Sequence, residues 1–172
     1  MRYPNRLFYF TLQALFLIFI SGCGFHLRGK VDVPTWFNNV AIIKGQTHND
    51  LASLLRMELQ SQHIQVNSSE SSADYWLILE SDNVQQHITS VSSSTTPRQY
   101  QLIYTVHFKL QQRNGRDIIP EATLMITRQL TINGNRILGS NEEEELLKAE
   151  MRRDAVIQIM NRISQVRFTQ KS

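Results

Sequence analysis

The stretch Tyr100–Leu110, YQLIYTVHFKL, carries the clearest structural pattern in the chain. Every second residue is apolar: Tyr100, Leu102, Tyr104, Val106, Phe108 and Leu110. The residues between them are mostly polar: Gln101, Thr105, His107 and Lys109. A period of two over eleven residues predicts a β-strand with one buried face and one wet face.

The segments on either side extend this strand into a sheet. Asn114-Gly115 tolerates positive φ and predicts a hairpin, so the next segment is an antiparallel neighbour. That segment, Ala122–Ile132, places Ala122, Leu124, Ile126, Leu130 and Ile132 on one face. Upstream, Tyr75–Val91 is a third long strand whose apolar residues give way to Ser, Gln and Thr. We expect its end to run past the core, into solvent or a partner, and residues 92–97 to form a hairpin tip.

The outer parts of the domain predict one more strand and two helices. Val40–Ile43 is a short buried strand, and Asn67–Ser72 is polar and predicts a loop. Leu51, Leu55 and Leu59 recur at i+4, which predicts a helix from Asn49 to about His63, capped by Asn49 or Thr47.

The last predicted element is a helix that starts at a capping box formed by Ser140 and Glu143. Its apolar stripe recurs every four residues and is widened on one side: Leu147, Met151, Ala155, Val156, Ile159, Met160 and Ile163. The predicted fold class is therefore α+β, with a four-stranded, mostly antiparallel sheet and two helices packed on one of its faces. The order of the strands stays open.

Composition excludes several classes of protein. The chain has 172 residues, enough for one domain, and 41% of them are hydrophobic, which argues against disorder. A single cysteine excludes an internal disulfide framework. The sequence has no GxSxG, P-loop, GxGxxG or HExxH motif, and its five histidines are not at ligand spacing. We therefore expect no enzyme activity, no catalytic residues, no metal site and no dissociable cofactor.

The N-terminus has the pattern of an export signal. Arg2 and Arg6 precede an apolar run, Leu7–Ile20, that spans only about 21 Å as a helix and so suits a secretory signal better than a membrane span. Ile20-Ser21-Gly22-Cys23 resembles a bacterial lipobox. An uncleaved signal anchor, or an ordinary signal peptide followed by a chance cysteine, is the alternative.

The lipobox resemblance implies that the chain is cut between Gly22 and Cys23, and that Cys23 carries a diacylglyceryl thioether and an N-acyl lipid. Residues 1–22 would then be the signal peptide and 23–39 an acylated N-terminal segment, followed by the domain, 40–172. Gly24 in place of Asp implies the outer membrane. Loss of Arg2 and Arg6 leaves 16 basic against 15 acidic residues, which gives no electrostatic case for nucleic acid.

Two surfaces of the domain have more than one interpretation. Trp36 and Phe37 either enter the membrane interface or pack against the first strand. The wet sheet face is neutral and rich in hydrogen-bonding groups: Gln99, Gln101, Thr105, Gln111, Thr127, Gln129 and Thr131. Such a face is either the contact surface for another protein or a plain solvated sheet.

The heptad that follows the lipobox, Cys23–Gly29 (CGFHLRG), is similar to the start of the LptE family of lipopolysaccharide-assembly lipoproteins. The likeness continues in YQLIYTV at 100–106, in GRDIIP at 115–120 and in the acidic start of the last helix. The resemblance implies a periplasm-facing outer-membrane lipoprotein that plugs the barrel protein LptD, helps it assemble, and takes part in passing lipopolysaccharide to the cell surface.

The resemblance also implies basic contacts to the glycolipid near the first hairpin tip and before the last helix. Those positions are Ser93 and Ser140 here. The nearest cations, Arg98 and Arg136, are the candidate contacts to lipid A phosphates. Two other functions stay open: a lipid-binding periplasmic lipoprotein that acts without a barrel, which would need an apolar cavity, and a tethered hydrolase, which would need a nucleophile and a base.

Overall fold

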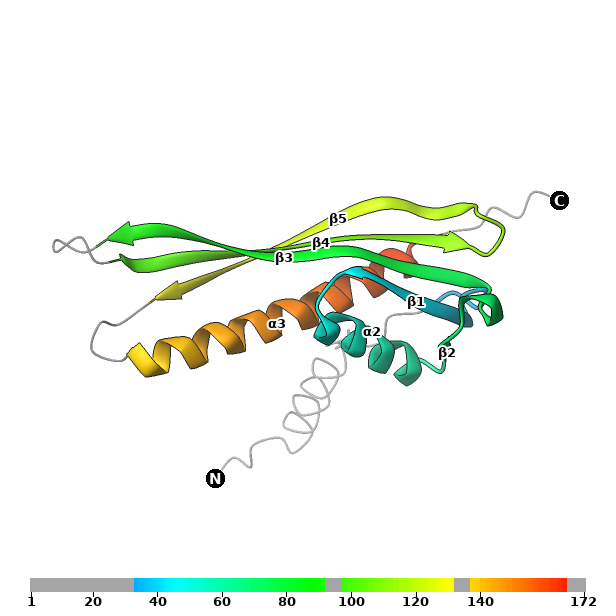
Figure 1. Ribbon diagram of the computed structural model, residues 1–172, viewed down its shortest axis with the longest axis horizontal. Helices are drawn as coiled ribbons and strands as arrows, with labels where there is room; N and C mark the ends of the chain where they lie inside the picture. Colours follow the sequence, from blue (N-terminus) through cyan, green and yellow to red (C-terminus); the bar gives the residue numbers. More distant parts are fainter. Residues whose placement is uncertain (1–32, 92–96, 132–136, 167–172) are drawn as a thin grey trace, which may run out of the picture. The chain divides into compact units, whose positions relative to one another are not determined.

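The structure, a computed structural model, describes residues 33–91, 97–131 and 137–166 of the chain. All of these belong to one compact unit. Five strands form a single sheet, and both helices lie on the same face of it (Figure 1). This arrangement confirms the α+β class and the placement of the two helices.

The sheet is mixed, with the strand order β2-β1-β3-β4-β5. β1 is parallel to both of its neighbours, β2 and β3, whereas β3, β4 and β5 run antiparallel to one another. The strands are β1 (Asn39–Gln46), β2 (Gln65–Asn67), β3 (Tyr75–Val91), β4 (Pro97–Gln112) and β5 (Asp117–Thr131).

The prediction of four mostly antiparallel strands was wrong in two respects. β2 has only three residues, which is too short for an alternating pattern to show. β1 and β2 are parallel because a helix, α2, lies between them and carries the chain back to the start of the sheet. The predicted loop after β2 contains a single 3₁₀ turn, Glu70–Ser72.

The first helix, α2 (Asn49–Ser61), buries Leu51, Leu55 and Leu59 as the spacing predicted. Its N-cap is His48, and no side chain of the capping residue bonds the helix start, so the predicted cap by Asn49 or Thr47 was wrong. Instead, the His48 backbone N–H donates to Oδ1 of Asp82 on β3 at 2.7 Å. A tertiary contact therefore replaces the local cap, and a local sequence pattern cannot show it.

The last helix, α3 (Ile137–Ser164), starts three residues before the predicted capping box, so Ser140 lies inside it and the predicted cap was wrong. Its apolar stripe is confirmed. Met151, Ala155, Ile159 and Ile163 are buried, and Leu147 packs at the margin of the core. Val156 and Met160 are also buried, and the two helices contact each other on that side of α3.

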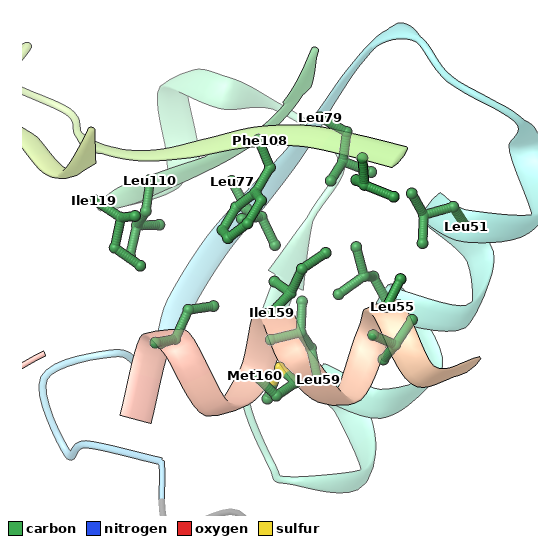
Figure 2. Close-up of a cluster of buried hydrophobic side chains, with 14 of the residues drawn as sticks. Leu51, Leu55, Leu59, Leu77, Leu79, Phe108, Leu110, Ile119, Ile159 and Met160 are labelled. Carbon is green, nitrogen blue, oxygen red and sulfur yellow. The ribbon is translucent and has the colours of Figure 1, made fainter. Parts of the chain in front are cut away.

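The core lies between the helices and the inner face of the sheet (Figure 2). Leu55 and Leu59 from α2 and Ile159 and Met160 from α3 point toward strand residues such as Phe108. Full burial of one such side chain stabilises the fold by about 1.5–3 kcal/mol. Phe37 is buried here and Trp36 packs at the edge, with ring centroids 5.8 Å and 5.0 Å from Tyr75. The packing interpretation of these two aromatic residues is thus confirmed.

Two glycines are required by the backbone. Gly115 has φ +87° in the β4–β5 hairpin, which confirms the Asn114-Gly115 turn. Gly45 on β1 faces a bulge at Glu80 of β3, where the pairing with β4 shifts by one residue. A Cβ on Gly45 would lie 2.5 Å from the Glu80 carbonyl oxygen, so only glycine lets the two backbones approach this closely.

Candidate partner interface

One face of β3, β4 and β5 points away from the helices. It forms a continuous neutral surface over the distal half of these strands, by which we mean the half nearer the β3–β4 connection; the proximal half is the one nearer the β4–β5 hairpin. The register aligns Asn83 with Thr105 and Met125 in one row and His87 with Gln101 and Gln129 in another. We call this set the outer face: Asn83, Gln85, His87, Gln99, Gln101, Ile103, Thr105, Met125, Thr127, Gln129 and Thr131. It contains no Lys, Arg, Asp or Glu.

The side chains of the outer face are exposed or half-buried. This confirms the predicted orientation of the alternating residues in β4 and β5. Met125 is 65% exposed, which is unusual for a large apolar side chain on a strand. A freely soluble monomer generally carries interspersed Lys and Glu on such a face, so the outer face has the composition of a contact surface.

The proximal part of the same sheet face differs from the outer face. Lys109 on β4 pairs with Glu80 on β3 at 3.2 Å, so opposite charges compensate each other there. Next to them, His107 Nδ1 lies 3.0 Å from the Thr123 hydroxyl. The charged pair and His107 lie just before the row that begins at Asn83, so the neutral surface begins beyond them.

A second polar site lies on the inner side, at the start of α2. Asp82 accepts hydrogen bonds from the Tyr104 hydroxyl and the His48 backbone N–H, both at 2.7 Å. Burial, and then the bond to Asp82, raises the pKa of Tyr104 well above its ordinary value, so this phenol stays protonated. The Asp82 carboxylate therefore joins β3, β4 and α2.

Asp82 also lines a cleft of about 420 Å³ between β3 and α3. Lys148 on the wall of the cleft bonds Glu144 and Glu145, both at 2.8 Å. These bonds raise the pKa of Lys148, and the bond to Lys148 lowers the pKa of Glu145. Because each of these charges already has a partner, we interpret the cleft as a structural network. Its only signal in the sequence is the polar end of the strand.

The structure does not describe the side chains of the residues predicted for lipid attachment and glycolipid contact. Gly22, Cys23, Ser93 and Arg136 lie outside the described residues. Arg98 lies on β4, but its side chain is also outside what the structure describes. All of these assignments stay predictions. Ser140 is placed on α3, without a described side chain.

The described part of the chain has neither a cluster of metal-binding side chains nor a membrane-crossing helix. Within residues 33–91, 97–131 and 137–166, no group of three or more His, Cys, Asp or Glu side chains is arranged to hold a metal ion. Neither α2 nor α3 combines the length and the apolar character that a membrane-crossing helix needs.

The fold and the outer face define a class of protein: a two-layer α+β domain with a long hairpin whose exposed sheet surface is neutral. Solved structures share this fold. Lipoprotein B of Nitrosomonas europaea matches with a TM-score of 0.66 and 26% identity over 82% of this chain and 90% of its own. Rare lipoprotein B of Shewanella oneidensis matches with a TM-score of 0.60 and 20% identity over 72% of this chain and 93% of its own.

The chain belongs to the LptE family, described as lipopolysaccharide-assembly, whose model matches residues 29–163. The LPS-assembly lipoprotein LptE of Pectobacterium atrosepticum is 24% identical over 97% of this chain and 90% of its own length. LptE of Yersinia pestis strain Pestoides F is 25% identical over 94% of this chain and 80% of its own. The resemblance seen in the sequence is thereby confirmed.

Proposed function

We propose that this chain is a periplasm-facing lipoprotein of the outer membrane that assembles lipopolysaccharide at the cell surface together with the barrel protein LptD. In this proposal the domain acts as the plug and the assembly partner of the barrel. The observation that carries it is the neutral, hydrogen-bonding outer face on a member of the LptE family. Because barrel interiors are polar, a neutral polar face can lie against one without burying unpaired charge.

The proposal includes a lipid anchor on Cys23 and no other cofactor. Residues 1–22 are the signal peptide, 23–39 the acylated segment and 40–172 the domain. Each buried methylene contributes about 0.8 kcal/mol, so three acyl chains hold a protein to a membrane far more durably than one. In this function the chain catalyses no reaction, and its partners are LptD, lipopolysaccharide and the membrane.

The test is co-expression with LptD from the same organism, followed by purification in detergent through a tag on LptD. We expect the two chains in equal amounts, and depletion of this chain should lower the amount of assembled LptD. Purification of this protein from native membranes as a monomer alone would count against the proposal. As the control for the anchor, Cys23→Ala should fold with an unchanged melting temperature but leave the membrane fraction.

Direct contact to lipopolysaccharide is a separate part of the proposal. Arg98 and Arg136 are the candidate cations, because guanidinium groups bind phosphates with paired hydrogen bonds. The double change Arg98→Gln and Arg136→Gln should weaken binding of diphosphorylated lipid A more than binding of its monophosphorylated form. Equal affinity of the double variant and the wild type for both lipids would remove these residues from the assignment.

One observation favours the second candidate, a lipid-binding lipoprotein that acts without a barrel. An apolar hollow of about 440 Å³ lies between α2 and α3, lined by Leu54, Met57, Val156 and Ile157 among others. Lipid that copurifies with the isolated protein, and that is lost on Met57→Lys, would support this second function. The same protein without bound lipid would favour the first.

A further inference from the structure

The free edge of β5 is the feature that the proposed function does not use. The strand order puts β5 at the end of the sheet, with β4 as its only pairing partner among the described residues. At the opposite end of the sheet, β2 limits its own edge by being only three residues long. An unpaired edge presents a row of N–H and C=O groups that can pair with another strand.

The proximal half of this edge is protected against strand pairing. Pro120 has no N–H to donate, and Asp117 and Glu121 are exposed charges on the same five-residue stretch. The pairing with β4 also shifts register here, between Phe108 and Leu110. Proline, charge and bulges are the usual means by which natural sheets block their edges.

The distal half, Ala122–Thr131, has none of these protections. It contains no Pro or Gly and a single charged residue, Arg128. Arg128 is engaged within the domain, because its guanidinium pairs with Asp154 on α3 and donates to the Thr127 carbonyl at 3.0 Å. No uncompensated charge would therefore oppose an added strand along these ten residues.

The Arg128 bond also shows which peptide groups face outward. The Thr127 carbonyl accepts a side-chain donor, so it points away from β4. In a strand the N–H and C=O of one residue point to the same edge, and this direction alternates from residue to residue. The N–H and C=O of Met125 and Gln129 therefore point the same way as those of Thr127. These three residues also have exposed side chains on the outer face, so edge and face are continuous.

We propose that Ala122–Thr131 accepts an extended segment of the barrel partner as a sixth strand of the sheet. This inference rests on the proposed function, because a partner seated on the outer face reaches Met125, Thr127 and Gln129 and hence the edge itself. Main-chain hydrogen bonds supply the affinity in strand addition, and exposed neutral side chains impose few demands on the added sequence. The added strand displaces the Arg128 guanidinium from the Thr127 carbonyl.

A second copy of this chain fits the edge less well than a different protein. Asp154 lies on the flank of α3 next to β5, and Glu150, one turn earlier, shares that flank. A twofold β5–β5 pair would place both α3 helices on one sheet face with these flanks toward each other. Asp154 is paired with Arg128, but the exposed Glu150 carboxylates would approach each other and repel, whereas a single strand added from a barrel protein brings no such helix.

The test compares Thr127→Pro with Thr127→Ala in the complex with LptD purified from detergent. Thr127→Pro removes one outward N–H, whereas Thr127→Ala removes only the side chain. We expect Thr127→Pro to bind LptD at least tenfold more weakly than Thr127→Ala, with both melting temperatures near that of the wild type. Equal binding of the two variants would overturn the inference and leave the proposed function standing.

Hydrogen exchange in the wild-type complex provides a second measurement that does not depend on whether Thr127→Pro folds. The amides of Met125, Thr127 and Gln129 should exchange at least tenfold more slowly in the complex than in the free protein, and unchanged rates would overturn the inference. If the wild type forms no complex with LptD, the proposed function fails and the inference fails with it. A dimer of the isolated protein that Thr127→Pro dissociates would assign the edge to a second copy instead.

Discussion

The two faces of β4 differ completely, although their residues alternate along a single strand. On the inner face, Leu102, Tyr104, Val106, Phe108 and Leu110 are each no more than 1% exposed. On the outer face, Gln101, Ile103 and Thr105 are half-buried and uncharged. The inner face is determined by the fold, because each side chain fills a place against the helices. The outer face has no such constraint from the core, and its neutral composition is what the proposed partner contact would explain.

The largest expected effect breaks the inner face. Ile159 is fully buried between α3 and the sheet, and Ile159→Asp would put an unpaired carboxylate there. We expect a loss of about 4 kcal/mol in the free energy of unfolding, measured by urea denaturation.

The matched control is Ile157→Asp, two residues along the same helix, where the side chain is 50% exposed. It should change the free energy of unfolding by less than about 0.5 kcal/mol. Similar losses for the two variants would show that burial on α3 is assigned to the wrong side.

The next effect concerns the one carboxylate on the inner side of β3. Asp82→Ala leaves the buried Tyr104 hydroxyl and the His48 N–H without their acceptor. We expect a loss of about 1–3 kcal/mol, with thermal and urea unfolding as the measurements. Asp82→Asn keeps one acceptor oxygen and should lose less than Asp82→Ala; the reverse order would contradict the network.

The same contact predicts a pH dependence. The pKa of Tyr104 is raised in the folded protein, whereas in the unfolded chain it returns to about 10. Above pH 10 the unfolded chain loses this proton and the folded protein keeps it, so stability is full below pH 10 and falls above it. The slope is about 1.4 kcal/mol per pH unit.

Tyr104→Phe should remove this part of the slope when unfolding is measured between pH 9 and 11.5. The pKa of Tyr75 is also raised, by burial and by Asp74, but Tyr75 is present in both proteins and its contribution cancels in the comparison. Parallel pH profiles for Tyr104→Phe and the wild type would show that the phenol is not held in its protonated form.

The smallest effect on stability belongs to the outer face. Gln101→Lys should change the free energy of unfolding by less than about 0.5 kcal/mol, because the side chain does not pack in the core. It should nevertheless reduce the amount of LptD that copurifies. Gln60→Lys makes the same change at an exposed position of α2 and should leave copurification unaltered. Full retention of LptD by Gln101→Lys would favour a plain solvated sheet.

Most of the fold followed from local patterns, and the parts that did not depend on contacts between distant residues. The alternation in β4, the Asn-Gly turn and the four-residue stripe of α3 each predicted an element correctly. β2 was missed because three residues carry no period. The predicted caps of both helices were wrong. At α2 the bond is a tertiary one to Asp82, and α3 starts before Ser140; neither feature shows in the local sequence.

The candidate interface was predictable as a composition but not as a surface. Alternation alone assigned Gln101, Thr105 and Gln129 to the wet side. The contribution of β3, through Asn83, Gln85 and His87, needed the register, which depends on a bulge that no residue pattern indicates. The free edge of β5 likewise needed the strand order, which the sequence left open.

The extra residue at Glu80 exchanges the inward and outward positions of the residues that follow on β3, relative to simple alternation from Leu79. Before it, Leu79 faces inward opposite Phe108. After it, Asp82 faces inward opposite Val106, one position later than Ser81, which simple alternation from Leu79 would place inward. Deletion of Glu80 alone would therefore restore simple alternation without exchanging the faces: Asn83, Gln85 and His87 would stay on the outer face and Val84 on the inner one. A family member could therefore lose this one residue and keep both faces of the hairpin, whereas the loss or gain of one residue within the regular pairing of Asp82–Ile88 would exchange the two faces of β3.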